Sequence, residues 1–518
     1  MIYFIYLLSL VFILLLLHKL KLLSFRVLPA FSATKTNALE HEDLLTLLDK
    51  FNYTHDDGVC HGFTLTWAQE TALGLEHQFY NRLNIIKREK ATLPNSLQLI
   101  TEKIKLSRTL SRKEQKLNEI KPFLEAVCLA QSPEDYPDVY AKAIQQSNID
   151  MIYKMIQLNL SRKQNAVKSL LSKTISRATA EEIGEFLNKL NSLFIVKNHV
   201  VVVFSSEEHT IGFKKHGDNL WLFMDINHLY EQSEDYPYQL LTSEELCPKL
   251  YKSLFETSEQ LVFHCSFIAK TGQRKLSQQI SSIDALYPIT SENLQISNCR
   301  GYGTLALAVQ NDDGTTVRKI LRLHKKAPVI SQSEFENAFF YAAACNRLNI
   351  MSQLINAPEI DINMSCNSDD SALAVACRYG HESIVRLLLE QSTIEVDIKN
   401  AKEMTPLMLA CRSSSTQNNK VLFELLLMAG ASLDLTNVDG ETAYDIAQKH
   451  NNEAALNAIA SYSAKTGHKV SPELSHKAKV SSGGLISFLT HSIFNNPAKS
   501  RTTPSEEESP EPAANLKV

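Results

Sequence analysis

The chain has 518 residues, of which 44% are hydrophobic and 21% are charged. This length allows two or three domains, and this composition excludes global disorder. Lys and Arg number 53 against 57 Asp and Glu, so the net charge of -4 provides no basic surface for nucleic acid. The nine cysteines include no C-x-x-C pair, which argues against a disulfide framework or a structural zinc site and favours a reducing compartment. No nucleotide or zinc motif is present, so no cofactor is expected.

The N-terminus is strongly apolar. Residues 2–17 (IYFIYLLSLVFILLLL) contain only Ser9 as a polar residue, and Lys19, Lys21 and Arg26 follow them. A helix of this length spans about 24 Å, slightly less than a hydrocarbon core of roughly 30 Å. The positive charges follow the apolar run, which argues against a cleavable signal peptide and keeps the next domain cytoplasmic. We expect residues 1–26 to be a membrane anchor, in which residues 2–25 span the membrane or lie in its surface. The alternative is an ordinary buried helix.

One six-residue pattern recurs five times in the C-terminal half: GTLALA at 303–308, FFYAAA at 339–344, SALAVA at 371–376, TPLMLA at 405–410 and TAYDIA at 442–447. The final alanines are separated by 32 to 37 residues, close to the ~33-residue period of ankyrin units. The small alanine lets a first helix lie close to its neighbour. Leucine runs such as IVRLLL at 384–389 supply a second helix.

This region resembles the ankyrin family in TPLMLACR, in ACRYGHESIVRLLL and in LLLMAGASLDLTNVDGETAYDIA. We expect about five repeats over residues 298–462, the first two degenerate. The resemblance implies a stacked helical surface that binds a protein, here a host substrate or adaptor, and that has no chemistry of its own. The alternative is that the repeats only cap the preceding domain. Residues 463–518 are rich in Ser, Lys, Pro and Glu and predict a disordered tail.

Residues 40–290 show no repeat, so we expect any chemistry there. Gly58 permits a sharp turn just before Cys60, and residues 64–75 have the composition of a helix. A thiol at the start of a helix has a lowered pKa because of the helix dipole. The backbone N–H of Cys60 can also contribute to an oxyanion hole. A cysteine nucleophile needs a base from elsewhere in the chain, and we expect the adjacent His61 to point away.

A base and an orienting residue are predicted downstream. Residues 199–206 (HVVVVFSS) predict a buried strand, and the following EHTIGFKKHGDNLWLFMDIN predicts a hairpin around the turn residues 214–219. Symmetry about Gly217 would pair three sets of residues: Phe213 with Trp221, Ile211 with Phe223, and His209 with Asp225. Paired residues have Cβ atoms roughly 5 Å apart, at which a carboxylate can accept the Nδ1 proton of an imidazole. A slip of one residue would separate His209 from Asp225.

The motif GVCHGFTLTW at 58–67, then His209 at the start of a strand and LFMDIN at 222–227, resembles the YopT and AvrPphB family of bacterial effector cysteine proteases. The resemblance implies a papain-like fold in which Cys60 is the nucleophile, His209 the base and Asp225 the orienting residue. Gly62 and Trp67 match structural positions. Two features depart from the family: Ile226 replaces a proline, and the side-chain donor of the oxyanion hole is unassigned, with Asn52 and His55 as candidates. We expect two further histidines in solvent: His216 at the hairpin tip and His228 beyond it.

The expected fold is an α+β papain-like cysteine protease domain (40–290) followed by an all-α ankyrin-repeat solenoid (298–462), with an N-terminal hydrophobic helix and a disordered C-terminal tail. The expected function is that of a bacterial effector cysteine protease that cleaves a host protein at a membrane surface. Glu506, Glu507 and Glu508 are similar to the Glu-rich signal of Dot/Icm type IV secretion substrates, which implies delivery into the host cytoplasm. The alternatives are a non-catalytic ankyrin scaffold with a degenerate protease fold, and a papain-fold deamidase or acyltransferase with the same triad.

Overall fold

The computed structural model describes residues 38–53, 58–133, 136–140, 146–160, 167–177, 179–231, 239–255, 260–365 and 369–468. The predicted anchor (1–26) lies outside these residues, and so does the predicted tail apart from its first six residues. No helix within the described ranges is long and apolar enough to span a bilayer.

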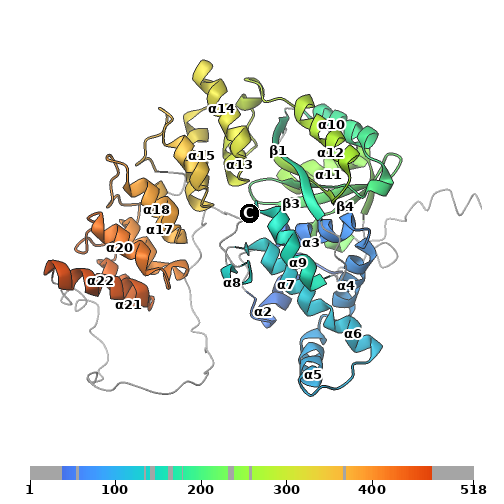
Figure 1. The fold of residues 1–518 in the computed structure, drawn as a ribbon, viewed down its shortest axis with the longest axis horizontal. Coiled ribbons are helices and arrows are strands. Elements are labelled where there is room, and N and C mark those ends of the chain that lie inside the picture. Colours follow the sequence, from blue (N-terminus) through green and yellow to red (C-terminus); the bar gives the residue numbers. More distant parts are fainter. Residues whose placement is uncertain are drawn as a thin grey trace, which may run out of the picture.

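The described N-terminal region starts with a lobe of helices, shown in blue and teal in Figure 1. They are α2 (His41–Lys50), α3 (Cys60–Ala72), α4 (Glu76–Glu89), α5 (Leu93–Lys105), α6 (Arg112–Asn118), α7 (Ile120–Gln131), α8 (Pro137–Tyr140) and α9 (Ile149–Leu160). Every residue of α3 is buried. A helix that is buried on all sides lies in the core of a domain, so α3 is the central helix of this lobe.

A six-stranded antiparallel sheet follows the helical lobe. Its strands are β1 (Val167–Arg177), β2 (Val201–Ser205), β3 (Thr210–Gly217), β4 (Leu220–Met224), β5 (Gln239–Thr242) and β6 (Leu261–Lys270), in the order β1-β6-β2-β3-β4-β5. The predicted buried strand is β2, and its side chains alternate between two cores. Val201 and Val203 face the helical lobe, whereas Val202 and Phe204 face the second layer of helices.

That second layer consists of α10 (Ala180–Leu193), α11 (Ser243–Phe255) and α12 (Arg274–Leu286). It covers the face of the sheet opposite α3 (Figure 1). Thr179 caps α10 by accepting a hydrogen bond from the Glu182 N–H, as the sequence TAEE favours. The sheet therefore lies between two helical layers, and two of the residues predicted to do chemistry, His209 and Asp225, lie next to the ends of β3 and β4.

The predicted hairpin is present, but its predicted register is wrong. In the structure Phe213 pairs with Phe223 and Lys215 with Trp221, with an irregularity between Lys215 and Gly217. The turn is made by the two residues between Gly217 and Leu220, and is not centred on Gly217. The pairing is thus displaced by two residues. Because side chains alternate with a period of two, this displacement leaves every side chain on its predicted face.

The five predicted repeats are five helix pairs: α13 (Thr304–Gln310) with α14 (Gly314–Lys326), α15 (Gln332–Ala344) with α16 (Leu348–Leu354), α17 (Ala372–Tyr379) with α18 (Glu382–Leu389), α19 (Pro406–Arg412) with α20 (Lys420–Met428), and α21 (Ala443–Lys449) with α22 (Glu453–Thr466). Their alanines and leucines form one continuous core. Figure 1 shows the pairs stacked in a row. The turns before three of the first helices each contain a β-bridge: Ser297 to Gly303, Ser365 to Ser371 and Thr436 to Thr442.

The row of helix pairs is attached to the sheet at its first helix. α13 contacts β1 and β6, and short 3-10 helices complete the connections: Val196–Asn198, Ile226–Glu231, Asn293–Gln295 and Ser414–Thr416. The chain thus combines an N-terminal region of helices and an antiparallel sheet with a C-terminal helical solenoid.

Candidate active site

Cys60 is the first residue of α3, as predicted. Its side chain is 5% exposed, and its Sγ lies 3.8 Å from the Glu208 carbonyl oxygen, to which it can donate. The residue before it, Val59, makes no side-chain cap. The first N–H groups of an α-helix have no acceptor within the helix, so the Cys60 sulfur lies at the positive end of the α3 dipole.

Gly62 lets α3 approach α7 closely. Its N–H donates to Gln131 Oε1 at 3.0 Å. A Cβ atom at this position would lie 2.1 Å from the Val127 carbonyl oxygen and 2.6 Å from the Gln131 N. No side chain fits there, which explains the glycine two residues after the cysteine.

Trp67 fixes α3 against β3. Its Nε1 donates to the Tyr80 hydroxyl at 2.9 Å, and its ring covers Gly212, where a Cβ would lie 2.4 Å from the Trp67 Cζ3. Gly62 and Trp67 therefore have the structural roles that the motif implied. Together they hold the start of α3 beside the strand that follows His209.

His209 lies in the turn of residues 206–209 that joins β2 to β3. The Ser206 N–H donates to the His209 carbonyl at 2.9 Å, and the His209 N–H donates to Ser206 Oγ at 3.1 Å. Its Nε2 lies 2.9 Å from Asp225 Oδ1. The prediction that Nδ1 would bond the carboxylate is therefore wrong, because the ring is rotated so that Nε2 faces Asp225.

Asp225 follows the last residue of β4 and is almost fully buried. Its carboxylate accepts three hydrogen bonds: from His209 Nε2 at 2.9 Å, from the Asn227 N–H at 2.9 Å and from His228 Nδ1 at 2.7 Å. His228 was expected in solvent, but its side chain is only 13% exposed. The turn after β4 brings it back to the carboxylate, and the sequence spacing of three residues was the signal for this contact.

The three groups shift one another's pKa values. Burial would raise the pKa of the Cys60 thiol, but its hydrogen bond with His209 and the charge of that ring lower it below the ordinary value. Burial would lower the pKa of His209, but hydrogen bonds to Asp225 and Cys60 raise it to about 10. Burial would raise the pKa of Asp225, yet its bonds with His209 and His228 hold it far below the usual range. These shifts favour a thiolate beside an imidazolium.

The two predicted oxyanion donors are not confirmed. Asn52 is exposed in the turn after α2, and His55 lies outside the described residues. His41, which no sequence pattern indicated, contacts the segment before Cys60 and holds it in place. The Val59 N–H lies 3.5 Å from His41 Nε2, and His41 Nδ1 lies 3.0 Å from Asn227 Oδ1.

His61 points away from Cys60, as predicted. Thr210 Oγ1 donates to Ser205 Oγ at 3.1 Å and lies 3.3 Å from His61 Nδ1. Because the Thr210 hydroxyl proton is used by Ser205, the hydroxyl oxygen accepts from His61, and Nδ1 carries the ring proton. Burial and the nearby His264 lower the pKa of His61 to about 4. His61 is thus a neutral residue that supports the β3 start and does not act as a base for Cys60.

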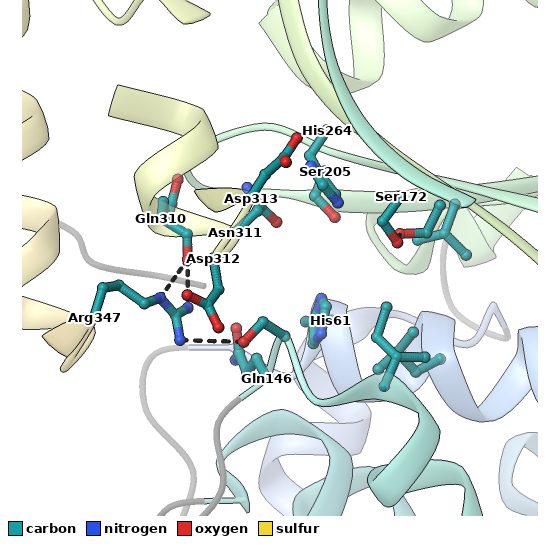
Figure 2. A pocket seen from close by; sticks show the side chains of 15 residues that line it. His61, Gln146, Ser172, Ser205, His264, Gln310, Asn311, Asp312, Asp313 and Arg347 are labelled. Carbon is teal, nitrogen blue, oxygen red and sulfur yellow. Dashed lines mark hydrogen bonds between the residues drawn. The ribbon is translucent and has the colours of Figure 1, made fainter. Parts of the chain in front are cut away.

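A polar cavity of about 190 Å³ lies on the His61 side of α3, at the junction with the first helix pair. Figure 2 shows His61 on one side of it and, across from His61, His264 near the turn that contains Asp313. Arg347 closes the wall by donating from Nε to the Gln310 carbonyl at 3.1 Å and from Nη1 to Ser147 Oγ at 3.2 Å. Cys60 does not line this cavity. Among the described residues no group of three or more His, Cys, Asp or Glu could hold a metal ion.

Comparisons with known proteins match the C-terminal region. Residues 305–400 match the family described as "Ankyrin repeats (3 copies)" and residues 402–438 match "Ankyrin repeat". The solved crystal structure of an ankyrin repeat protein is similar, with a TM-score of 0.30 and 22% sequence identity over 37% of this chain and 92% of that one. The prediction of ankyrin repeats is confirmed by the two family matches, and such repeats bind proteins.

Proposed function

We propose that this ankyrin-repeat chain is a cysteine peptidase with a papain-like N-terminal domain, which cleaves a protein that the repeats recruit. The observation that supports this most is the convergence of Cys60, His209 and Asp225, which are separated by 149 and 16 residues. A thiol at a helix start, next to a histidine whose far nitrogen bonds a buried carboxylate, is the arrangement that activates a cysteine nucleophile.

The proposed reaction has two steps. The Cys60 thiolate attacks a peptide carbonyl carbon, forming a C–S bond while the C–N bond breaks and His209 gives its proton to the leaving amine. Water then attacks the thioester carbon, His209 takes a proton from it, and the Cys60 thiolate is released. Asp225 keeps the ring oriented through Nε2, so that Nδ1 faces the sulfur. The Cys60 N–H, at the positive end of α3, would stabilise the oxyanion.

The cellular setting is proposed from the sequence. Delivery by a type IV system into a host cell follows from the likeness of Glu506, Glu507 and Glu508 to known signals, together with eukaryote-like repeats beside an effector motif. An N-terminal anchor would hold the enzyme at a membrane, and the repeats would raise the effective concentration of one target at the cleft.

There are three alternatives, of which two use the same triad. A deamidase would attack a side-chain amide and release ammonia, and an acyltransferase would pass the acyl group from Cys60 to an amine instead of to water, because the triad fixes neither the amide that is attacked nor the acceptor. A non-catalytic scaffold would use only the repeats. The thiolate-favouring pKa shifts support catalysis over the scaffold, since a buried structural cysteine has a raised pKa, as Cys265 has.

Covalent labelling tests the proposal. We expect an epoxysuccinyl peptide probe to label the wild type on Cys60, to leave Cys60→Ala unlabelled, and to react with His209→Ala roughly 10²-fold or more slowly, because the thiolate is lost. Cys128→Ala is the matched control, because Cys128 is buried and its pKa is raised to about 12, so labelling should be unchanged. Equal labelling of wild type, Cys60→Ala and His209→Ala would mean that another cysteine reacts and that Cys60 is not activated.

Membrane attachment is tested by deletion of residues 2–25. We expect the full chain to stay with carbonate-washed membranes and the deleted form to be released, because the apolar run would be the attachment. The labelling of Cys60 should be the same in both forms. Identical sedimentation of the two forms would rule out the anchor.

A further inference from the structure

The turn that carries His209 is held from the other side by the first ankyrin repeat. Residues 206–209 form this turn, and Glu207 and Glu208 are its two central residues. Glu207 is only 2% exposed, although a carboxylate at the tip of a hairpin turn is usually solvated. Its burial means that another part of the chain covers the tip.

Three residues of the repeat region make this cover. Asn298 Nδ2 donates to Glu207 Oε2 at 2.8 Å, and Gln310 Nε2 donates to the Glu207 carbonyl at 3.0 Å. Arg300 pairs with Glu208 and lies 3.6 Å from Glu207 Oε1. Asn298 and Gln310 are themselves 5% and 1% exposed. Hydrogen bonds between buried partners cost more to lose than exposed ones, because water does not replace them.

The Asn298 contact repeats a contact inside the array. Asn298 Oδ1 accepts from the Arg300 and Tyr302 N–H groups, and Asn400 Oδ1 accepts from the Lys402 and Met404 N–H groups in the corresponding turn. In both turns the Nδ2 group is left to donate outward.

The partner of that outward bond differs between the two turns. Asn400 Nδ2 donates to Asp370 Oδ1, a residue of the preceding repeat, at 2.8 Å. Asn298 has no preceding repeat, and Glu207 of the N-terminal region takes the position of Asp370. The catalytic turn therefore docks onto the array as a preceding repeat would, in a nearest-neighbour contact of the kind that stabilises solenoids.

Only one residue separates Glu207 from His209, and the Glu208 carbonyl lies 3.8 Å from Cys60 Sγ. A shift of the turn tip would thus move both the base and the carbonyl that faces the thiol. We propose that Asn298 and Gln310 of the first repeat are positioning residues of the active site, which hold the 206–209 turn so that His209 faces Cys60. This inference rests on the proposed function, and it makes the first repeat part of the catalytic unit as well as of the recruiting surface.

The pH dependence of Cys60 alkylation by iodoacetamide in the full chain tests this inference without a known substrate. Asn298→Asp keeps the oxygen that orders its turn and loses the donor to Glu207. Asn400→Asp makes the same change against Asp370 and is the matched control. We expect Asn298→Asp to raise the apparent pKa of Cys60 by about two units and to slow alkylation at pH 6 about tenfold. The pH profile of Cys60 alkylation in Asn400→Asp should be the same as that of the wild type.

The contact can also be restored with its polarity reversed. In the double variant Asn298→Asp with Glu207→Gln, the new amide donates to the new carboxylate, and we expect the alkylation rate at pH 6 to return to within about threefold of the wild type. Gln310→Leu, like Asn298→Asp, should slow alkylation at pH 6, because it removes the donor to the Glu207 carbonyl.

Each outcome decides one point. Wild-type profiles for both Asn298→Asp and Gln310→Leu would overturn the inference, and so would equal changes in Asn298→Asp and Asn400→Asp, which would indicate a general loss of array stability. The inference would also be overturned if the double variant kept the slow alkylation rate at pH 6 while its tryptophan fluorescence showed a native fold. If the wild type itself showed an ordinary thiol profile, the proposed function would fail first, which separates the two results.

Discussion

Replacing Asp225 by asparagine is expected to slow alkylation of Cys60 by iodoacetamide at pH 6 on the order of 10²-fold, because an opposite charge at this distance shifts a pKa by one to three units. Asp225 is buried and bonds His209 Nε2 at 2.9 Å. Without the carboxylate, burial dominates and the pKa of His209 falls, so the ring no longer stabilises the thiolate.

The sign of the pH dependence follows from the two shifts. The ion pair exists above the lowered pKa of Cys60 and below the His209 pKa of about 10. The wild-type rate should therefore be nearly flat from about pH 6 to 9, whereas the Asp225→Asn rate should rise about tenfold per unit toward the ordinary thiol pKa. The control is Asp218→Asn at the exposed tip of the same hairpin. A flat profile in Asp225→Asn would contradict the role of the carboxylate.

Replacing Gly62 by alanine is expected to destabilise the N-terminal region by about 3 kcal/mol, at the upper end of overpacking effects. The added methyl would lie 2.1 Å from the Val127 carbonyl oxygen and 2.6 Å from the Gln131 N. Both are backbone atoms of α7, so a side-chain rotation cannot relieve the contact. The two helices would have to separate, and the start of α3 would move with them.

The measurement is the denaturation midpoint followed by tryptophan fluorescence. Both tryptophans of the chain, Trp67 and Trp221, are buried in the N-terminal region, so this signal reports on that region and not on the repeats. Gly184→Ala in α10 is the control. No atom lies within 4 Å of its added methyl, so a helical alanine should stabilise by up to about 1 kcal/mol. A midpoint for Gly62→Ala equal to that of the wild type would show that α3 and α7 are not closely packed in solution.

The features that the sequence predicted correctly are those with local or periodic signals. The alanine-ended strings located all five helix pairs because every repeat needs a small alanine at the position where its first helix packs against a neighbouring repeat. Cys60 was placed at a helix start because Gly58 and the following residues mark that boundary. The predicted hairpin correctly brought His209 and Asp225 together although the predicted register was wrong, because an error of two residues leaves each side chain on the same face of the sheet.

The features that the sequence could not predict depend on small irregularities or on distant contacts. The hairpin turn lies at residues 218 and 219 and not on Gly217, and together with the irregularity between Lys215 and Gly217 this displaces the pairing by two residues. The rotation of the His209 ring, which puts Nε2 against Asp225, has no signal in the sequence. The bond between Asn298 and Glu207 joins residues 91 positions apart, and no pattern in the chain relates them. His41 reaches Asn227 across 186 positions for the same reason.

The solenoid is joined to the sheet at its α13 end, whereas α22 lies at the far end of the row (Figure 1). Gain or loss of a helix pair next to α22 would leave the Asn298 bond to Glu207 intact, since repeats interact with their nearest neighbours. An extra pair inserted before α13 would place a new turn against residues 206–209. In natural variants of this protein, we therefore expect the number of repeats to change at the C-terminal side, so that the range of captured proteins can diversify while the geometry around Cys60 stays constant.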